Sequence, residues 1–113
     1  MDMEVMDAET GATDVRLVGR LDAAGADRIG LRFTVAVASK PQPALVDLAG
    51  VSFVASMGIR LLVATAKALR LKGHTMVLYG AQTEVQDTFE QAALDQILDI
   101  AADRPQALQR IAG

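Results

Sequence analysis

Apolar and polar residues alternate in two stretches near the start of the chain. The first covers residues 1–8, and the second, residues 15–21, places arginines between aliphatic side chains. Residues 9–13, which include Gly11, have the composition of a turn. Because a period of two residues is typical of a half-buried β-strand, this pattern predicts an N-terminal β-hairpin.

Two longer segments have the features of helices. Residues 23–38 are rich in alanine and end before a pair of prolines, which disfavour helix in the residues that precede them. Asp22 stands directly before this segment and is a candidate helix cap. Residues 56–72 repeat apolar side chains every three or four positions, and Gly73 is a typical residue just after a helix end.

The C-terminal part of the chain predicts two more helices. Thr83 can cap the first, and Asp103, followed closely by a proline, can cap the second. The side chains expected to face inward are Val85, Phe89 and Ala92 in the first helix, and Leu108 and Ile111 in the second.

Apolar runs at residues 44–48, 75–79 and 97–101 predict three strands between these helices. We expect residues 49–55 to form an irregular loop after the first of them. Strands that alternate with helices pair in parallel, because each helix carries the chain back across the sheet. The sequence therefore predicts an α/β fold with one domain over residues 1–113, a mixed and mostly parallel β-sheet, an N-terminal hairpin and about four α-helices.

Composition and charge exclude several classes of function. The chain has 113 residues, a net charge of −3 and no cysteine, so disulfides and thiolate metal sites are excluded and nucleic-acid binding is disfavoured. The first residues lack the features of a secretory signal, and no apolar stretch approaches the length of a membrane span. We therefore expect a cytoplasmic protein with no nucleic-acid partner and no direct membrane insertion.

The sequence offers little catalytic chemistry. The single histidine, His74, follows Gly73 in a predicted turn and has no Cys or Glu at metal-ligand spacing. Ser56 lacks a neighbouring base, and the scattered glycines form no phosphate-binding loop. We expect no catalytic residue, no metal and no cofactor, and we interpret Asp47 as a structural carboxylate.

Residues 46–62, VDLAGVSFVASMGIRLL, resemble the signature of STAS-domain anti-sigma factor antagonists. That signature is an apolar strand ending in Asp-Leu, a short loop with Phe, and a Ser-containing segment with Gly that opens a helix. Residues 18–22, VGRLD, resemble the family's Gly-Glu-Leu-Asp turn. Residues 73–78 and 85–89 extend the similarity over nearly the whole chain.

The resemblance implies a protein-binding switch. Ser56 matches the serine that an anti-sigma factor phosphorylates, and this partner is a serine kinase of the histidine-kinase ATPase fold. The unphosphorylated antagonist binds the kinase and frees the sigma factor; the phosphorylated form lets go until a metal-dependent serine phosphatase restores it. The expected partner-binding residues are Arg20, Asp22, Val54, Ala55, Ser56, Met57, Gly58 and Arg60.

Two departures from the family pattern keep other functions open. Ala55 stands where an acidic residue is usual, and Met57 stands where a second Ser or Thr is common. One alternative is an accessory subunit of a lipid-transport ABC system, which docks on an ATPase subunit without phosphorylation; another is a stressosome-type scaffold. Each residue also has a structural interpretation: Ser56 as an N-cap, Gly58 as a close packing contact and Met57 as part of the core.

Overall fold

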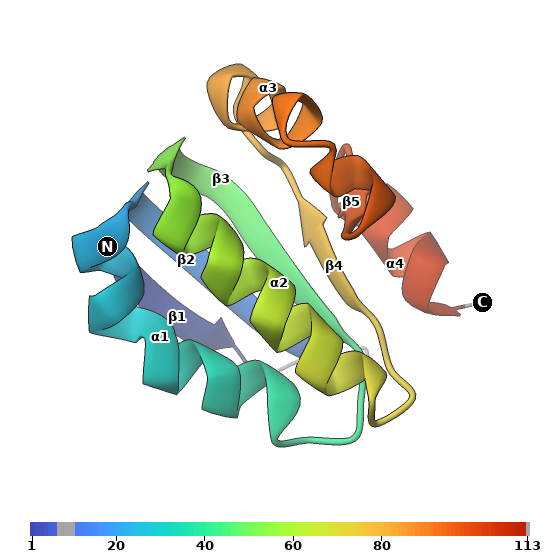
Figure 1. Cartoon of the computed structure of the whole chain (residues 1–113). Coiled ribbons are helices and arrows are strands. Elements are labelled where there is room, and N and C mark those ends of the chain that lie inside the picture. Colours follow the sequence, from blue (N-terminus) through green and yellow to red (C-terminus); the bar gives the residue numbers. More distant parts are fainter. Residues whose placement is uncertain (7–10, 113) are drawn as a thin grey trace.

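The strands of the protein form one mixed sheet with neighbours in the order β1-β2-β3-β4-β5 (Figure 1). The structure is a computed structural model that describes residues 1–6 and 11–112. β1 pairs with β2 antiparallel and every other pair is parallel, which confirms the predicted hairpin and sheet. Within the predicted turn, residues 9 and 10 lie outside the described residues. The elements are β1 (Asp2–Met6), β2 (Thr13–Leu21), α1 (Ala23–Ala38), β3 (Ala44–Val54), α2 (Ser56–Arg70), β4 (Met76–Tyr79), α3 (Thr83–Gln91), the 3-10 helix η1 (Leu94–Gln96), β5 (Asp99–Ala101) and α4 (Arg104–Ala112).

Helices cover the two faces of the sheet unequally. α1 and α2 lie side by side across one face, and α3 contributes Phe89 to the same core as Phe33 of α1 and Leu62 of α2 (Figure 1). α4 packs on the opposite face, where Ala107 belongs to the same buried cluster as Leu45. Because successive side chains of a strand point to opposite faces, β3 supplies alternate residues to the two cores. Over β1 and β2, that opposite face carries charged side chains.

The strand β3 is longer than predicted from the sequence. The predicted loop at residues 49–55 is wrong, because β3 continues to Val54 and pairs with β2 as far as Leu21. Two register shifts interrupt this pairing. At Gly50, a Cβ atom would lie 2.9 Å from Cγ2 of Val18, so the absence of a side chain there lets the two strands approach.

The helix ends confirm some predicted caps and correct others. Asp22 accepts a hydrogen bond from the Gly25 backbone N–H at 2.8 Å, and Asp103 accepts one from Gln106 at 3.0 Å, as expected of N-caps. Thr83 is already inside its helix, whose N-cap, Gln82, makes no side-chain capping hydrogen bond. The stop at Gly73 is confirmed by its φ of +84°.

Two details of the C-terminal part also differ from the prediction. Ala92 is exposed, because α3 ends at Gln91 and the chain turns away at Ala93, whose φ is +55°. The last strand begins at Asp99 rather than at residue 97, since η1 ends at Gln96 and residues 97 and 98 form a turn before the strand. Leu108 and Ile111 are half-buried against the α4 core, in agreement with the predicted face of that helix.

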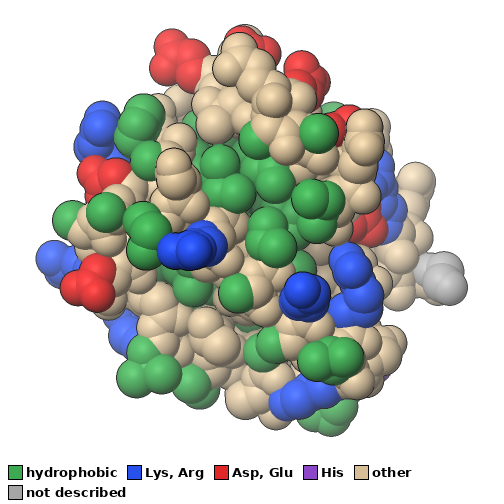
Figure 2. Space-filling model, viewed as in Figure 1, with side chains coloured by type: hydrophobic (Ala, Val, Ile, Leu, Met, Phe, Trp, Pro, Cys, Tyr) green, Lys and Arg blue, Asp and Glu red, His purple; other side chains and the backbone are tan. Residues whose placement is uncertain are grey.

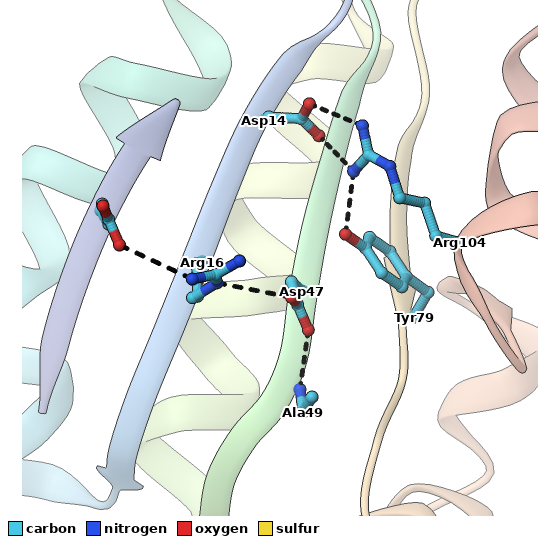
Figure 3. A network of polar contacts seen from close by, with 7 residues as sticks. Asp14, Arg16, Asp47, Ala49, Tyr79 and Arg104 are labelled. Atoms are coloured by element: carbon cyan, nitrogen blue, oxygen red, sulfur yellow. Dashed lines mark hydrogen bonds and ion pairs between the residues drawn. The ribbon is translucent and has the colours of Figure 1, made fainter. Parts of the chain in front are cut away.

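An ion pair between the half-buried Arg104 and the buried Asp14 ties α4 to the start of β2. Arg104 donates to both carboxylate oxygens of Asp14, at 3.0 and 2.9 Å, and to the hydroxyl of Tyr79 at 3.0 Å (Figure 3). Asp14 is buried, and its bond with Arg104 raises the pKa of the guanidinium above its usual range. Nearby, Arg16 lies between Glu4 and Asp47, and Asp47 accepts a hydrogen bond from the Ala49 N–H, the structural role expected for it.

We expect Arg104→Met to lower the free energy of unfolding by about 3 kcal/mol, because it leaves the Asp14 carboxylate buried without its partner. Denaturant unfolding measures this loss. Arg110→Met is the matched control: Arg110 pairs with Asp99 at a more exposed position, so its loss should stay below about 1 kcal/mol. Equal losses for the two variants would contradict this account of the ion pair.

Candidate functional site

The candidate site lies where β2 and β3 end and both α1 and α2 begin. The backbone N–H of Ala55 donates to the Leu21 carbonyl at 3.0 Å, which joins the ends of the two strands just before α2 starts. The carboxyl edge of parallel strands is where binding sites concentrate in open α/β sheets. Ser56, the first residue of α2, is exposed at this edge.

Ser56 is not the N-cap of α2. Ala55 occupies the cap position with extended backbone, and its methyl side chain makes no capping hydrogen bond. The first turn of α2 also contains no acidic residue. The N-terminus of this helix, which carries the positive end of the helix dipole, therefore has no side-chain cap. It also has no carboxylate in its first turn to offset the positive charge of the dipole.

Gly58 brings α2 against the end of β2. It is buried, and a Cβ atom at this position would lie 2.3 Å from the Leu21 carbonyl oxygen and 2.6 Å from Leu21 Cγ. Val54 is buried as well. These two residues therefore position the surface around Ser56 instead of forming it, which favours the structural interpretation of Gly58.

The residues that do form this surface are a mixture of apolar and cationic side chains. Met57 is 45% exposed, so the interpretation of Met57 as a core residue is wrong. Nη1 of Arg60 lies 3.9 Å from Met57 Sδ, so the guanidinium lies back over the first turn of α2. Among the expected partner-binding residues, Arg20, Ser56, Met57 and Arg60 are exposed, whereas Asp22 and Ala55 are half-buried.

Phe53 also belongs to this surface, although it is not among the partner-binding residues expected from the sequence. Its ring is 40% exposed, and the Arg20 guanidinium lies over it, 4.3 Å from the ring centroid. Nε of Arg20 also lies 3.5 Å from Asp22, the residue that caps α1. The hydrogen bond from the Gly25 N–H is the main cause that holds the pKa of Asp22 below its usual value.

A groove runs between the starts of α1 and α2, and Met57, the residue after Ser56, forms part of its lining. Its volume is about 650 Å³, and four of its eight lining residues are alanines; Asp27 lies on the α1 side, and Met57, Arg60 and Leu61 lie on the α2 side. Figure 2 shows this face of the molecule, with broad apolar areas interrupted by separate Lys and Arg side chains. The shape and chemistry suit a protein side chain or segment with apolar groups and a charge.

Several features that would support catalysis lie far from Ser56 or are not found. His74 follows the opposite end of α2 from Ser56. Because this helix has 15 residues and rises about 1.5 Å per residue, its whole length separates the two side chains, and His74 cannot act as a base for Ser56. Over residues 1–6 and 11–112, no three His, Asp or Glu side chains come together in a way that could hold a metal ion. No helix in the same residues is long and apolar enough to cross a membrane.

The model of the STAS domain family matches residues 5–107 of the chain. Among solved structures, an anti-sigma-factor antagonist (STAS) domain protein from Planctomyces limnophilus is 21% identical, with a TM-score of 0.85 and coverage of 100% of both chains. An anti-sigma factor antagonist from Mycobacterium paratuberculosis is 21% identical, with a TM-score of 0.88 and coverage of 99% of this chain and 94% of that one. The Bacillus cell fate determinant SpoIIAA in its phosphorylated form is 18% identical, with a TM-score of 0.65 and coverage of 97% and 99%. No curated protein matches the sequence. At these identities the solved structures support the fold.

We expect Gly58→Ala to lower the free energy of unfolding by about 1–3 kcal/mol, because the added methyl group collides with the Leu21 backbone. Gly30→Ala is the matched control inside α1, where the new Cβ would lie 3.8 Å from Leu61 and the change should stabilise the protein by about 0.5–1 kcal/mol. Thermal or denaturant unfolding measures both. A stabilising effect of Gly58→Ala would show that α2 can move away from β2 at no cost.

Proposed function

The chain belongs to the STAS domain family, and from this premise we propose that it is an anti-sigma factor antagonist. In this proposal it binds an anti-sigma factor serine kinase of the histidine-kinase ATPase fold and thereby releases the sigma factor. Phosphorylation of Ser56 ends the complex, and a metal-dependent serine phosphatase restores the binding form. The observation that carries the proposal is the exposed position of Ser56 at the start of α2, directly before Met57, which lines a mostly apolar groove.

The exposed surface supports partner binding. Met57, Phe53 and the groove between α1 and α2 offer apolar area, while Arg20 and Arg60 add charges. Apolar anchors surrounded by polar groups are typical of protein interfaces. The names of two similar solved proteins, both anti-sigma factor antagonists, agree with this class of partner.

The electrostatics of α2 support a phosphate on Ser56 that leaves the fold intact. A phosphoserine carries about −1.5 to −2 charges, and a negative group near a helix N-terminus is favourable. Ser56 is the first residue of a helix that has no acidic residue in its first turn, and Arg60 follows one turn later. Phosphorylation would therefore weaken partner binding and not the fold, because a partner that contacts Met57 and the groove would have to desolvate the phosphate.

Ala55 favours one alternative. Where the family usually has an acidic residue before the serine, this chain has a methyl group with no capping hydrogen bond. In the accessory-subunit alternative, the same groove docks an ATPase subunit of a lipid-transport ABC system and Ser56 is never phosphorylated. Binding without phosphate transfer would distinguish this alternative from the proposal.

We expect the cognate kinase and ATP to add one phosphate to the wild-type chain and none to Ser56→Ala, while Ser56→Ala still binds the kinase. Transfer of the γ-phosphoryl group of ATP to Oγ of Ser56 would release ADP and then weaken the complex. Intact-mass and phosphosite mapping by mass spectrometry measure the modification, and a pull-down measures the binding.

Ser52→Ala is the control for this experiment. Ser52 is exposed four residues earlier, with its hydroxyl 3.4 Å from the Gly19 carbonyl, and its loss should leave the phosphorylation unchanged. Thr65 is buried and therefore out of reach of a kinase in the folded protein. Phosphate mapped to Ser52 in place of Ser56 would refute the proposed switch.

We also expect Met57→Asp to raise the dissociation constant of the kinase complex about tenfold or more, because a carboxylate would enter a desolvated apolar contact. Leu71→Asp is the matched control, since Leu71 is 87% exposed beyond the other end of α2. Calorimetric titration measures both variants, and circular dichroism should show native helix content for each. Unchanged affinity of Met57→Asp would remove Met57 from the partner surface.

A further inference from the structure

The outer side of α1 carries a ridge of four exposed residues, Ala24, Arg28, Leu31 and Val35, which we call the α1 ridge. The opposite side of the helix is buried, with Ile29, Phe33 and Val37 in the core. Leu31 is 80% exposed and Val35 is 54% exposed, so large aliphatic side chains point into solvent from a helix that is already packed on the sheet. Exposed aliphatic residues gathered on one helix face are typical of an association surface.

The spacing of the α1 ridge matches the seam of a two-stranded coiled coil. Its residues follow one another at intervals of four, three and four, which is the alternation of d and a positions in a heptad. Leu31 then occupies a d position and Val35 an a position. In a parallel coiled coil, a β-branched residue at a combined with Leu at d favours two strands over three or four.

The charges beside the α1 ridge fit the same arrangement. Asp27 lies on one flank and Arg32 on the other, at the g and e positions of the heptad, five residues apart. In a parallel pair of identical helices, the g position of one faces the e position five residues later in the other. Within residues 1–6 and 11–112, neither Asp27 nor Arg32 has an ion-pair partner in the monomer.

We infer that the α1 ridge is the interface of a homodimer, in which α1 of a second copy packs in parallel against it. Two equivalent ion pairs then form, each between Asp27 of one copy and Arg32 of the other. An apolar groove of about 380 Å³ borders the ridge on the β1 side and offers further contact area next to Leu31 and Val35; its apolar lining also includes Met3, Val5 and Ala36. Antiparallel packing would instead place like charges on the same flank.

The dimer is weak and reversible. The ridge covers only residues 24–35, and the two Arg28 side chains meet at an a position, where a charged residue reduces stability while it favours a defined oligomer. Asp2 of the same copy, 4.0 Å from Arg28, reduces that repulsion. Because the sheet already holds α1 in its helical form, association requires no ordering of the helix.

Sedimentation of the purified full chain tests the inference. We expect the weight-average mass to rise from monomer toward dimer with increasing concentration, and Leu31→Asp to raise the dimer dissociation constant at least about tenfold. Leu71→Asp, the same change at an equally exposed leucine away from α1, should leave dimerisation unchanged. A wild-type chain that stays monomeric up to about 1 mM, or a dimer that tolerates Leu31→Asp, would overturn the inference.

Charge exchange and cross-linking test the parallel register. Asp27→Arg and Arg32→Asp should each weaken the dimer several-fold, and the double variant should recover wild-type affinity. Because the chain has no cysteine, Ala24→Cys reports geometry directly: with a mild oxidant it should form a disulfide-linked dimer, whereas Leu71→Cys should not. A different result would refute the proposed pairing: if Ala24→Cys forms no disulfide with a second Ala24→Cys chain but does form one when mixed with the Val35→Cys variant, the helices are antiparallel.

Discussion

The close approach of α2 to the end of β2 at Gly58 organises the functional edge of this protein. The approach is possible only because residue 58 has no side chain, since a methyl group there would overlap the Leu21 carbonyl. The Ala55 N–H donates a hydrogen bond to the same Leu21 carbonyl, so the end of β3 is attached to the end of β2. Ser56 and Met57 reach the surface as a consequence, next to Asp22 and the start of α1. The function proposed for Ser56 therefore depends on a contact that is itself buried.

The two faces of the sheet are stabilised by different interactions. On the face covered by α1, α2 and α3, aliphatic side chains and two phenylalanines form the core, and the exposed parts of α1 and α2 remain free to bind. On the other face, Asp14 and Arg104 join segments 90 residues apart and hold α4 over β4 and β5. This ion pair lies at the start of β2, whereas Ser56 follows the end of β3 next to the other end of β2. A change at one site can thus alter stability without touching the partner surface.

Local chemistry explains which features the sequence could predict. Asp22 and Gly73 act on their own immediate neighbours, and the alternation of strands and helices forces parallel pairing, so these predictions were confirmed. The end of β3 was not predictable in this way, because residues 49–54 become a strand only through pairing with β2. The same holds for Phe53, whose partner Arg20 comes from another strand, and for Arg104, whose partner Asp14 lies near the other end of the chain. Ser56 also looked like a cap until the structure placed Ala55 in that position.

The two proposed binding surfaces meet on α1. Asp27 lines the groove beside Met57 and Arg60, and it also forms the charged flank of the α1 ridge. A second copy that pairs with Asp27 would occupy one wall of the groove, so a partner seated there and a second copy seated on the ridge would exclude or weaken one another. Linkage requires the effect to be reciprocal: the factor by which dimerisation lowers partner affinity equals the factor by which the partner lowers dimer affinity. Because the dimer is weak, a partner that binds the groove with even moderate affinity converts the protein to its monomeric, partner-bound form. Release of the partner by phosphate on Ser56 would then return the chain to the dimer equilibrium.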